Sequence, residues 1–225
     1  MSLVRSLTET SLLSDHDIKE LIKDGKLYIE PYESAAINQA SIDLRLGSIL
    51  VQYPPQTIKI GVDRPQSREI DISNSSYVLH PGEFVLGTTK EEVYIPNGYQ
   101  GVIETKGGIA RAGLWVHNND GHIDAGFRGH ITLEIVNMHR DNVFIELAPD
   151  TLICQLFIGK LSSSCDSLYN GKYLNQAKPT TYYPDVPKTP NAPLLSNALS
   201  FGRTHFFSLP YFTWFHHRFS RSTKE

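Results

Sequence analysis

The chain has 225 residues, of which 40% are hydrophobic and 20% charged, which is enough for one domain of ordinary size and an appendage. The formal net charge of −3 argues against a general nucleic-acid-binding protein. The 2 cysteines are too few for a disulfide scaffold and fit a reducing, cytoplasmic compartment. The N-terminus lacks the apolar core of a signal peptide, and no stretch approaches the ~20 apolar residues of a membrane span. We therefore expect no membrane span.

A short helix is expected near the N-terminus. Ser14 is a suitable cap, Asp15 and Asp17 favour the positive end of the helix dipole, and Gly25 is a suitable end. An apolar stripe at helical spacing lies between them and consists of Ile18, Leu21 and Ile22.

After this helix the hydrophobic period changes to the two-residue period of half-buried strands. In SIDLRLG the apolar Ile42, Leu44 and Leu46 alternate with two charged residues, and the alternation recurs in EFVLGTT, HITLEIV and NVFIELAP. Turn-forming Gly, Pro, Asn and Asp separate these segments. Many short strands after one leading helix predict a mainly β domain, either a barrel or a sandwich.

The composition changes near Tyr183, where YPDVPKTPNAP is rich in proline and indicates a linker. The last stretch is dense in aromatic and basic side chains, with Glu225 as its only acid. We predict a folded domain over residues 1–183, and a linker with an aromatic and basic tail over residues 184–225. The tail is open to three interpretations: a peptide that binds a partner or a membrane surface, a tail packed on its own oligomer, or a disordered end.

One predicted strand carries an acid of interest. In HITLEIV, Ile131, Leu133 and Ile135 are expected to share one face, and Thr132 and Glu134 the other. An acid on the second face of a strand is most often solvated, so Glu134 alone predicts no site.

The neighbouring segments bring further charged residues close to Glu134. Asp124 and Arg128 come from the segment before this strand. Lys106 and Arg111 are the first and last residues of KGGIAR, which is either a phosphate cradle or only a turn between strands. Two acids and several cations that converge on adjacent strands are able to hold an anionic ligand and move protons.

Several common functional motifs are missing from the sequence. The histidines His117, His122 and His130 do not have the HxxxH or CxxC spacing of zinc sites, so we expect no structural metal site. The HxE and PCxxC pattern of zinc nucleobase deaminases is absent, as are GxSxG, the P-loop and a strand followed by GxGxxG.

From Leu13 to about Gln176 the sequence resembles the dCTP deaminase branch of the trimeric dUTPase superfamily. Six stretches carry the resemblance in order: LLSDHDIKELIKDGKLYIEP, ASIDLRLG, LHPGEFVLGTT, IDAGFRGHITLEI, LICQLF and YNGKYLNQ. The resemblance implies a mainly β subunit, a distorted β-barrel related to the jelly roll with a short N-terminal helix. It also implies a homotrimer with active sites between subunits. These sites would hydrolyse the 4-amino group of dCTP without zinc, with Mg²⁺ bound only through the triphosphate.

The same resemblance implies roles for individual residues. Glu134 would be the general acid/base, taking a proton from the water that attacks C4 and delivering it to N3 and then to ammonia. Arg111 would orient this carboxylate and the water, and Asp124 would contact the deoxyribose or the base. The other implied contacts are Lys106, Gly107, Gly108, Ile109 and Ala110 at the phosphates, the backbone of Thr132 and Leu133 at the pyrimidine, and Gln155, Tyr169, Lys172 and Gln176 over the triphosphate. Without the resemblance, Lys106, Gln155, Tyr169 and Lys172 are interpreted as surface or packing residues.

Two segments depart from the family pattern, at three positions. The family has Arg/Lys-Ser-Ser-x-x-Arg where this chain has Gly107 and Gly108, and the first serine helps hold the attacking water. Asp120 stands where the family has an alanine whose carbonyl positions the same water. Three functions therefore stay open: a deaminase that forms dUTP or dUMP, a dUTPase-like pyrophosphatase, and a nucleotide-binding protein with reduced or no turnover. Inhibition by dTTP is also left open.

Overall fold

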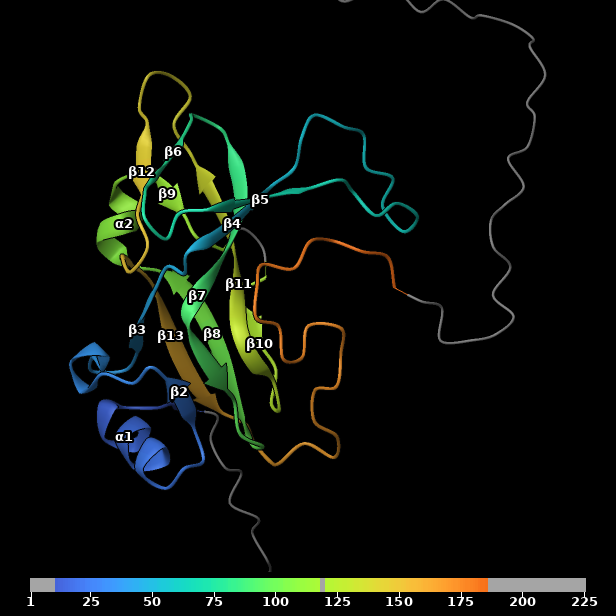
Figure 1. The fold of residues 1–225 in the computed structure, drawn as a ribbon. Helices are drawn as coiled ribbons and strands as arrows, with labels where there is room; N and C mark the ends of the chain where they lie inside the picture. The colour runs from blue at the N-terminus through green and yellow to red at the C-terminus, as the bar shows by residue number, and fades with distance from the viewer. Residues whose placement is uncertain (1–10, 118–119, 186–225) are drawn as a thin grey trace, which may run out of the picture. The chain divides into compact units, whose positions relative to one another are not determined.

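A computed structural model describes residues 11–117 and 120–185, and the statements below concern this part of the chain. It consists of antiparallel strands with three short helical elements (Figure 1). The helical elements are α1 (Asp15–Lys23), the 3-10 helix η1 (Ser34–Ala36) and α2 (Gly107–Arg111). The strands are β1 (Ser11–Leu12), β2 (Tyr28–Glu30), β3 (Ile42–Arg45), β4 (Ile49–Gln52), β5 (Arg68–Asp71), β6 (Tyr77–Leu79), β7 (Phe84–Tyr94), β8 (Tyr99–Thr105), β9 (Leu114–Trp115), β10 (His122–Ile123), β11 (Arg128–Asn137), β12 (Ile145–Leu147) and β13 (Leu152–Lys160). From residue 186 on, the predicted linker and tail lie outside the described residues.

The predicted N-terminal helix is confirmed as α1. Its cap is Ser14, whose hydroxyl accepts a hydrogen bond from the backbone N–H of Asp17 at 3.5 Å. Ile18 and Leu21 are buried beneath the helix. The helix ends at Lys23, and Gly25 follows with φ of +66°, which glycine adopts without the strain that a Cβ would cause.

The strands form three antiparallel sheets. The six-stranded sheet has the order β5-β4-β7-β11-β9, with β2 also paired to β7. The five-stranded sheet has the order β1-β13-β8-β10, with β3 also paired to β13, and β12 pairs with β6 in a separate sheet. The mainly β prediction is confirmed, but in the part of the chain described these sheets do not join into one closed barrel.

The central strand β11 has the two faces that its sequence predicts. Ile131, Leu133 and Ile135 are at most 4% exposed and belong to the aliphatic core shared by the two larger sheets. Thr132 and Glu134 lie half-buried on the other face. Pairing with β7 holds this register along most of the strand. The strand therefore presents Glu134 away from the core.

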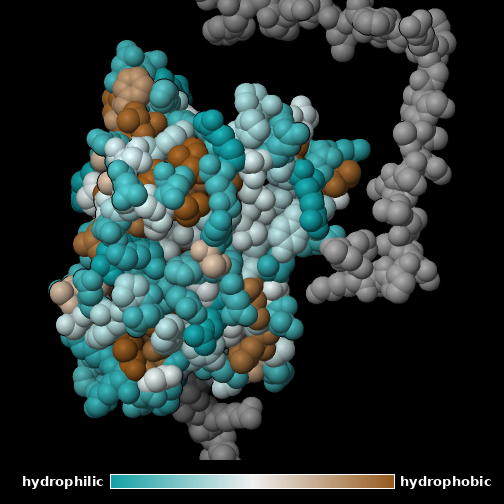
Figure 2. All heavy atoms as spheres, viewed as in Figure 1, coloured by the Kyte–Doolittle hydropathy of each residue, from teal (hydrophilic) through white to brown (hydrophobic). Residues whose placement is uncertain are grey.

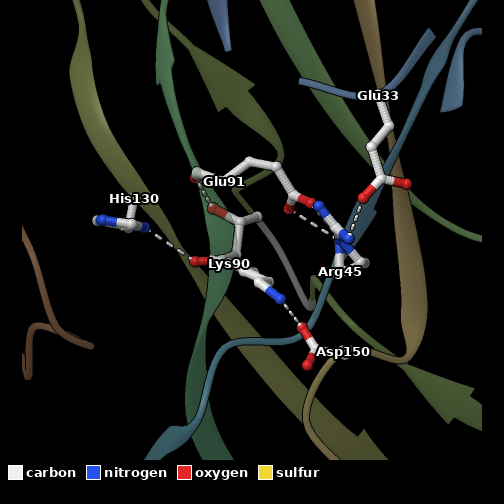
Figure 3. A network of polar contacts seen from close by, with 7 residues as sticks. Glu33, Arg45, Lys90, Glu91, His130 and Asp150 are labelled. Carbon is white, nitrogen blue, oxygen red and sulfur yellow. Dashed lines mark hydrogen bonds and ion pairs between the residues drawn. The ribbon is translucent and has the colours of Figure 1, made fainter. Parts of the chain in front are cut away.

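The polar face of β3 is buried, unlike the half-exposed strand expected from SIDLRLG. Asp43 is 8% exposed. Arg45 binds two acids, with its Nε 2.7 Å from Glu91 Oε1 on β7 and its Nη1 2.6 Å from Glu33 Oε1 (Figure 3). The side chain of Glu91 is only 4% exposed, so this pair compensates charges that would be costly to bury alone. The ion pair thereby ties β3 to β7.

Apolar side chains reach the surface in separate small areas, as one face of the molecule shows (Figure 2). One area lies over β6 and β12, where Val78 and Phe144 are 48% and 54% exposed. Another lies between β4 and β5, where Ile60 is 74% exposed. None of the helices within the described residues combines the length and apolarity needed to cross a bilayer.

Candidate functional site

A cavity of about 520 Å³ lies beside the outer face of β11. Thr132 and Glu134 line it from β11, and Asp120 and Asp124 line it from the chain on either side of β10. Six aromatic rings form much of the remaining wall: Tyr53, Phe84, Phe127, Tyr169, Tyr173 and Tyr182. The volume falls in the range of cavities that bind small molecules, and a wall that combines aromatic and apolar side chains with polar groups is typical of such sites.

One edge of β11 is open where it borders this cavity. The other edge pairs with β7. On the open edge, Gly129 bridges Gln176, and Val136 and Asn137 pair with β9. Between these two points no strand of the described chain pairs with β11 on that side. Backbone N–H and C=O groups at such an edge can hydrogen-bond the edge of a planar base.

The cavity brings together six of the residues singled out in the sequence: Asp120, Asp124, Thr132, Glu134, Tyr169 and Gln176. Gln176 closes over the strand, because its Nε2 donates to the carbonyl of His130 at 2.7 Å. The hydroxyl of Thr132 donates to Gln176 Oε1 at 3.2 Å and accepts from the backbone N–H of Thr180 at 3.3 Å. The chain after β13 therefore forms one wall of the cavity.

The segment KGGIAR is neither a strand-to-strand turn nor part of this cavity. Residues Gly107–Arg111 form the short helix α2, and Arg111 Nη1 donates to the carbonyl of Gly107 at 3.0 Å. Lys106 Nζ lies 2.5 Å from Asp43 Oδ2. Among the described residues, the cavity lining includes no residue from 106–111. A buried carboxylate needs a cation, so Asp43 accounts for the position of Lys106.

Within one chain, Lys106 and Arg111 therefore do not line the cavity with Glu134. Arg128 also lies elsewhere, since its Nε is 2.7 Å from Glu92 Oε1 and its guanidinium stacks over the ring of Tyr28 at 5.1 Å. The neighbouring sequence could not predict these two partners of Arg128, because Glu92 belongs to β7 and Tyr28 to β2.

Three further predicted contacts do not line the cavity. Gln155 on β13 donates to Asp43 Oδ1 at 3.1 Å and to Ser41 Oγ at 3.2 Å. The side chain of Leu133 is fully buried in the core, so only its backbone remains available to a ligand. Lys172 Nζ lies 2.8 Å from Asp185 Oδ1, which holds the lysine at the surface.

Sequence reasoning missed several polar residues of the cavity: Tyr53, His122, Tyr173, Thr180 and Tyr182. His122 Nε2 lies 3.0 Å from Asp124 Oδ1. Burial raises the pKa of Tyr53, and the nearby carboxylate of Glu134 raises it further, while the N–H of Tyr182 acts in the opposite direction. The predicted domain over residues 1–183 already included Tyr182, and the tyrosine pair before the proline-rich run was the signal that could have placed it at the cavity.

The electrostatics of the cavity wall are unbalanced. Asp120, Asp124 and Glu134 are acidic, whereas His122 is the single basic side chain among the described lining residues. An anionic ligand would need cations from elsewhere, since like charges repel across a partly desolvated cavity. The described residues contain no group of three or more His, Cys, Asp or Glu side chains able to hold a metal ion.

The sequence of this chain is similar to proteins named dCTP deaminase. A sequence profile of the family described as dCTP deaminase-like matches residues 12–161. The chain is 32% identical over 169 residues to the "dCTP deaminase, dUMP-forming" of Persephonella marina, an alignment that covers 73% of this chain and 92% of that protein. It is 38% identical over 179 residues to the Rhodococcus erythropolis protein of the same name, covering 75% and 94%.

A solved structure supports the fold. The crystal structure of 2′-deoxycytidine 5′-triphosphate deaminase from Agrobacterium tumefaciens matches with a TM-score of 0.54 at 22% sequence identity. The match covers 67% of this chain and 48% of that chain, so it spans about half of the larger protein. At this identity the likeness is one of fold.

Proposed function

This chain belongs to the dCTP deaminase-like family, and on that basis we propose that it hydrolyses the 4-amino group of dCTP and releases ammonia. The observation that carries the proposal is the position of Glu134, on the face of β11 that lines a cavity of about 520 Å³ beside an open strand edge. The names of the similar bacterial proteins favour dUMP and pyrophosphate as the final products over dUTP.

Glu134 acts as the general acid/base in this proposal. A water beside its carboxylate gives up one proton as the water oxygen attacks C4 of the cytosine, and the protonated carboxyl passes that proton to N3. The new C4 hydroxyl then loses its proton through Glu134 to the amino group. The C4–N bond breaks, ammonia leaves, and a C4 carbonyl remains on the uracil base. Hydrolysis of the triphosphate to dUMP would be a separate step.

The cations for the triphosphate come from another copy of the chain. The acidic wall of the cavity and the exposed position of Arg111 on α2 support this arrangement. In a homotrimer, the partner subunit's Lys106 and Arg111 would meet the phosphates and Glu134, and the unpaired N–H groups of the first turn of α2, at Gly107 and Gly108, would add donors. Mg²⁺ would arrive with the triphosphate as part of the substrate.

The remaining contacts follow from the cavity. Asp124 would bind the deoxyribose or the base, and the backbone at Thr132 and Leu133 would bind the pyrimidine edge. Tyr169 and Gln176 would cover the phosphates from the chain after β13, since both line the same cavity. A thymine nucleotide such as dTTP has no 4-amino group to lose, so it would occupy this cavity as an inhibitor.

A second candidate function is nucleotide binding with little turnover. The observation that favours it is glycine at position 107, which offers no hydroxyl to hold the attacking water. Loss of one preorganised donor from an active site costs on the order of 10²–10³ in rate. Asp120 lines the cavity, and its carboxylate is able to replace the missing partner of the water.

One assay separates these functions. The full-length protein is incubated with dCTP and, separately, with dUTP in the presence of Mg²⁺, and ammonia, dUTP, dUMP and pyrophosphate are quantified. We expect ammonia and dUMP from dCTP. Pyrophosphate from dUTP with no ammonia from dCTP would support a pyrophosphatase. Tight dCTP binding without any product would support the binding protein.

A further inference from the structure

The cavity wall formed by residues 169–185 contains no strand or helix of its own. Tyr169, Tyr173, Gln176 and Tyr182 all line the cavity from this segment, here called the C-terminal wall. A segment without regular hydrogen bonding takes its position from contacts with other parts of the fold. Those contacts therefore decide whether the cavity keeps its shape.

A second irregular segment lies beside it. Residues 53–67 leave the six-stranded sheet between β4 and β5, and we call them the β4–β5 excursion (Figure 1). The side chain of Gln56 closes the base of this excursion, since it donates to the carbonyl of Gln66 at 2.7 Å and accepts from the backbone N–H of Gln66 at 2.9 Å. Asp63 accepts from the backbone N–H of Lys59 at 2.7 Å. The excursion is thus held by its own polar contacts, with both ends anchored in paired strands.

Tyr182 connects the two segments through its side-chain hydroxyl and through its backbone N–H. Its hydroxyl accepts from the backbone N–H of Gly61 at 2.6 Å, and its backbone N–H donates to the hydroxyl of Tyr53 at 3.0 Å. Tyr53 and Tyr182 both line the cavity. A single residue therefore connects the excursion, the C-terminal wall and the space around Glu134.

The next residue adds a second attachment. The guanidinium of Arg64 lies 5.6 Å from the centre of the Tyr183 ring, and Lys172 Nζ lies 4.8 Å from the same ring. The hydroxyl of Tyr183 donates to the carbonyl of Lys172 at 3.0 Å. Cations at these distances from an aromatic ring attract it. Elsewhere in the C-terminal wall, Lys178 Nζ lies 2.8 Å from Glu69 Oε2 on β5.

We propose that the β4–β5 excursion is a clamp that positions the C-terminal wall over the nucleotide cavity, with Arg64 and Tyr182 as its positioning residues. The identity of the ligand rests on the proposed function, whereas the clamp itself does not. Without the clamp the wall opens, and residues that cover the ligand, such as Gln176, lose their place. Because the clamp does not touch the reacting atoms, its loss weakens binding more than it slows the chemical step.

The test uses two variants of the full-length protein. Tyr182→Phe keeps the ring in the cavity and removes the hydroxyl that accepts from Gly61, and Arg64→Gln removes the cation over Tyr183. For each variant we expect KM for dCTP to rise about threefold to tenfold, the factor that one lost hydrogen bond or cation–π contact corresponds to, with kcat within about twofold. Arg64→Lys keeps a cation at the ring and should restore KM. Ile60→Ser, at a residue that is 74% exposed on the same excursion, is the matched control and should change neither constant.

Hydrogen–deuterium exchange gives a readout that needs no substrate. We expect faster exchange of the amides at 173–183 in both variants, with exchange in β11 unchanged. Unchanged exchange would overturn the clamp, and faster exchange with an unchanged KM would overturn its role in binding. Faster exchange in a protein that never turns over dCTP would retain the clamp and reject the proposed function instead.

Discussion

At the scale of single residues, the carboxyl group of Glu134 carries the proposed chemistry. Glu134→Gln keeps the size and polarity of the side chain but cannot accept the proton of the attacking water. We expect the rate of ammonia release to fall about 10²–10⁴-fold, the contribution typical of a positioned acid or base. Binding of dCTP, measured by calorimetry, should persist.

The matched control for this variant is Glu20→Gln on α1, a residue whose side chain is 50% exposed and distant in sequence from the cavity. It should leave ammonia release unchanged. Ammonia release by Glu134→Gln at the wild-type rate would remove Glu134 from the proposed mechanism and leave the cavity as a binding site only.

Glycine at position 107 allows a test of activity gained rather than lost. A Cβ at this position would meet Arg111 Nη1 at 3.4 Å, the far end of a flexible side chain, so Gly107→Ser is compatible with the fold. If the missing hydroxyl limits the reaction, restoring it should raise kcat by up to about 10²-fold. Gly107→Ala is the control, because it adds the same Cβ without the hydroxyl and should not give this gain. No gain at position 107 would show that the site holds its water in another way, with Asp120 as the first residue to replace.

Individual residues were predictable where local pattern decides their environment. The outward position of Glu134 followed from the alternation along β11, and the cap at Ser14 from its place before an acidic first turn. The partners of Lys106 and Arg128 were not predictable, because Asp43 and Glu92 are 63 and 36 residues away in sequence. Which partner a charged side chain contacts, and how deeply it is buried, depends on the tertiary fold and not on the residue type.

At the scale of elements, the contact between β6 and the start of β7 predicts a pH dependence. The hydroxyl of Tyr77 donates to Glu83 Oε1 at 2.5 Å, and burial, with this carboxylate, raises the pKa of Tyr77 to about 12. The unfolded chain releases the same proton near pH ~10. The stabilisation is therefore fully present below about pH 10 and is lost as the pH rises toward 12, because the unfolded state deprotonates first.

The measurement is urea unfolding of the wild type and of Tyr77→Phe across this range. The difference in free energy of unfolding between the two proteins should be largest near neutral pH and should shrink between about pH 10 and pH 11. Comparing the two proteins cancels the titration of the other tyrosines. A difference that stays constant with pH would mean that Tyr77 and Glu83 do not interact as described.

Elements with a strong hydrophobic period were predictable, and elements positioned by distant contacts were not. The hydrophobic periodicity of the sequence was sufficient to predict the helix α1 and the strand β11. The helix α2 was not predicted, since KGGIAR was interpreted as either a phosphate cradle or a turn between strands. Two glycines disfavour a helix, yet the fold between β8 and β9 accommodates one helical turn there. The C-terminal wall has no hydrophobic periodicity that could have predicted its position. Tyrosines that bind the β4–β5 excursion hold it in place.

At the scale of the whole molecule, one chain does not bring all residues of the proposed site to the same cavity. The cavity carries the proposed acid and an aromatic wall, while α2 with Arg111 lies outside the lining. The family resemblance predicted a site shared between identical chains. The division of the residues between two regions of one chain is what such a shared site requires.

Mixing two inactive variants tests the shared site. Glu134→Gln and Arg111→Gln should each have little activity, because every site in a homotrimer of one variant lacks one of the two groups. When the variants are co-expressed and assemble at random, a site that takes Glu134 from one chain and Arg111 from the next is intact in about a quarter of cases. We therefore expect ammonia release at about a quarter of the wild-type rate.

The double variant Glu134→Gln/Arg111→Gln provides the control for this experiment. Mixed with the Glu134→Gln variant it should give no recovery, because no chain in the mixture then supplies Glu134. Mixed assembly is verified by native mass spectrometry with one variant carrying a tag. If mixed trimers form from the two single variants but stay inactive, the two groups do not meet across subunits. The acidic cavity would then need its cations from a source other than α2.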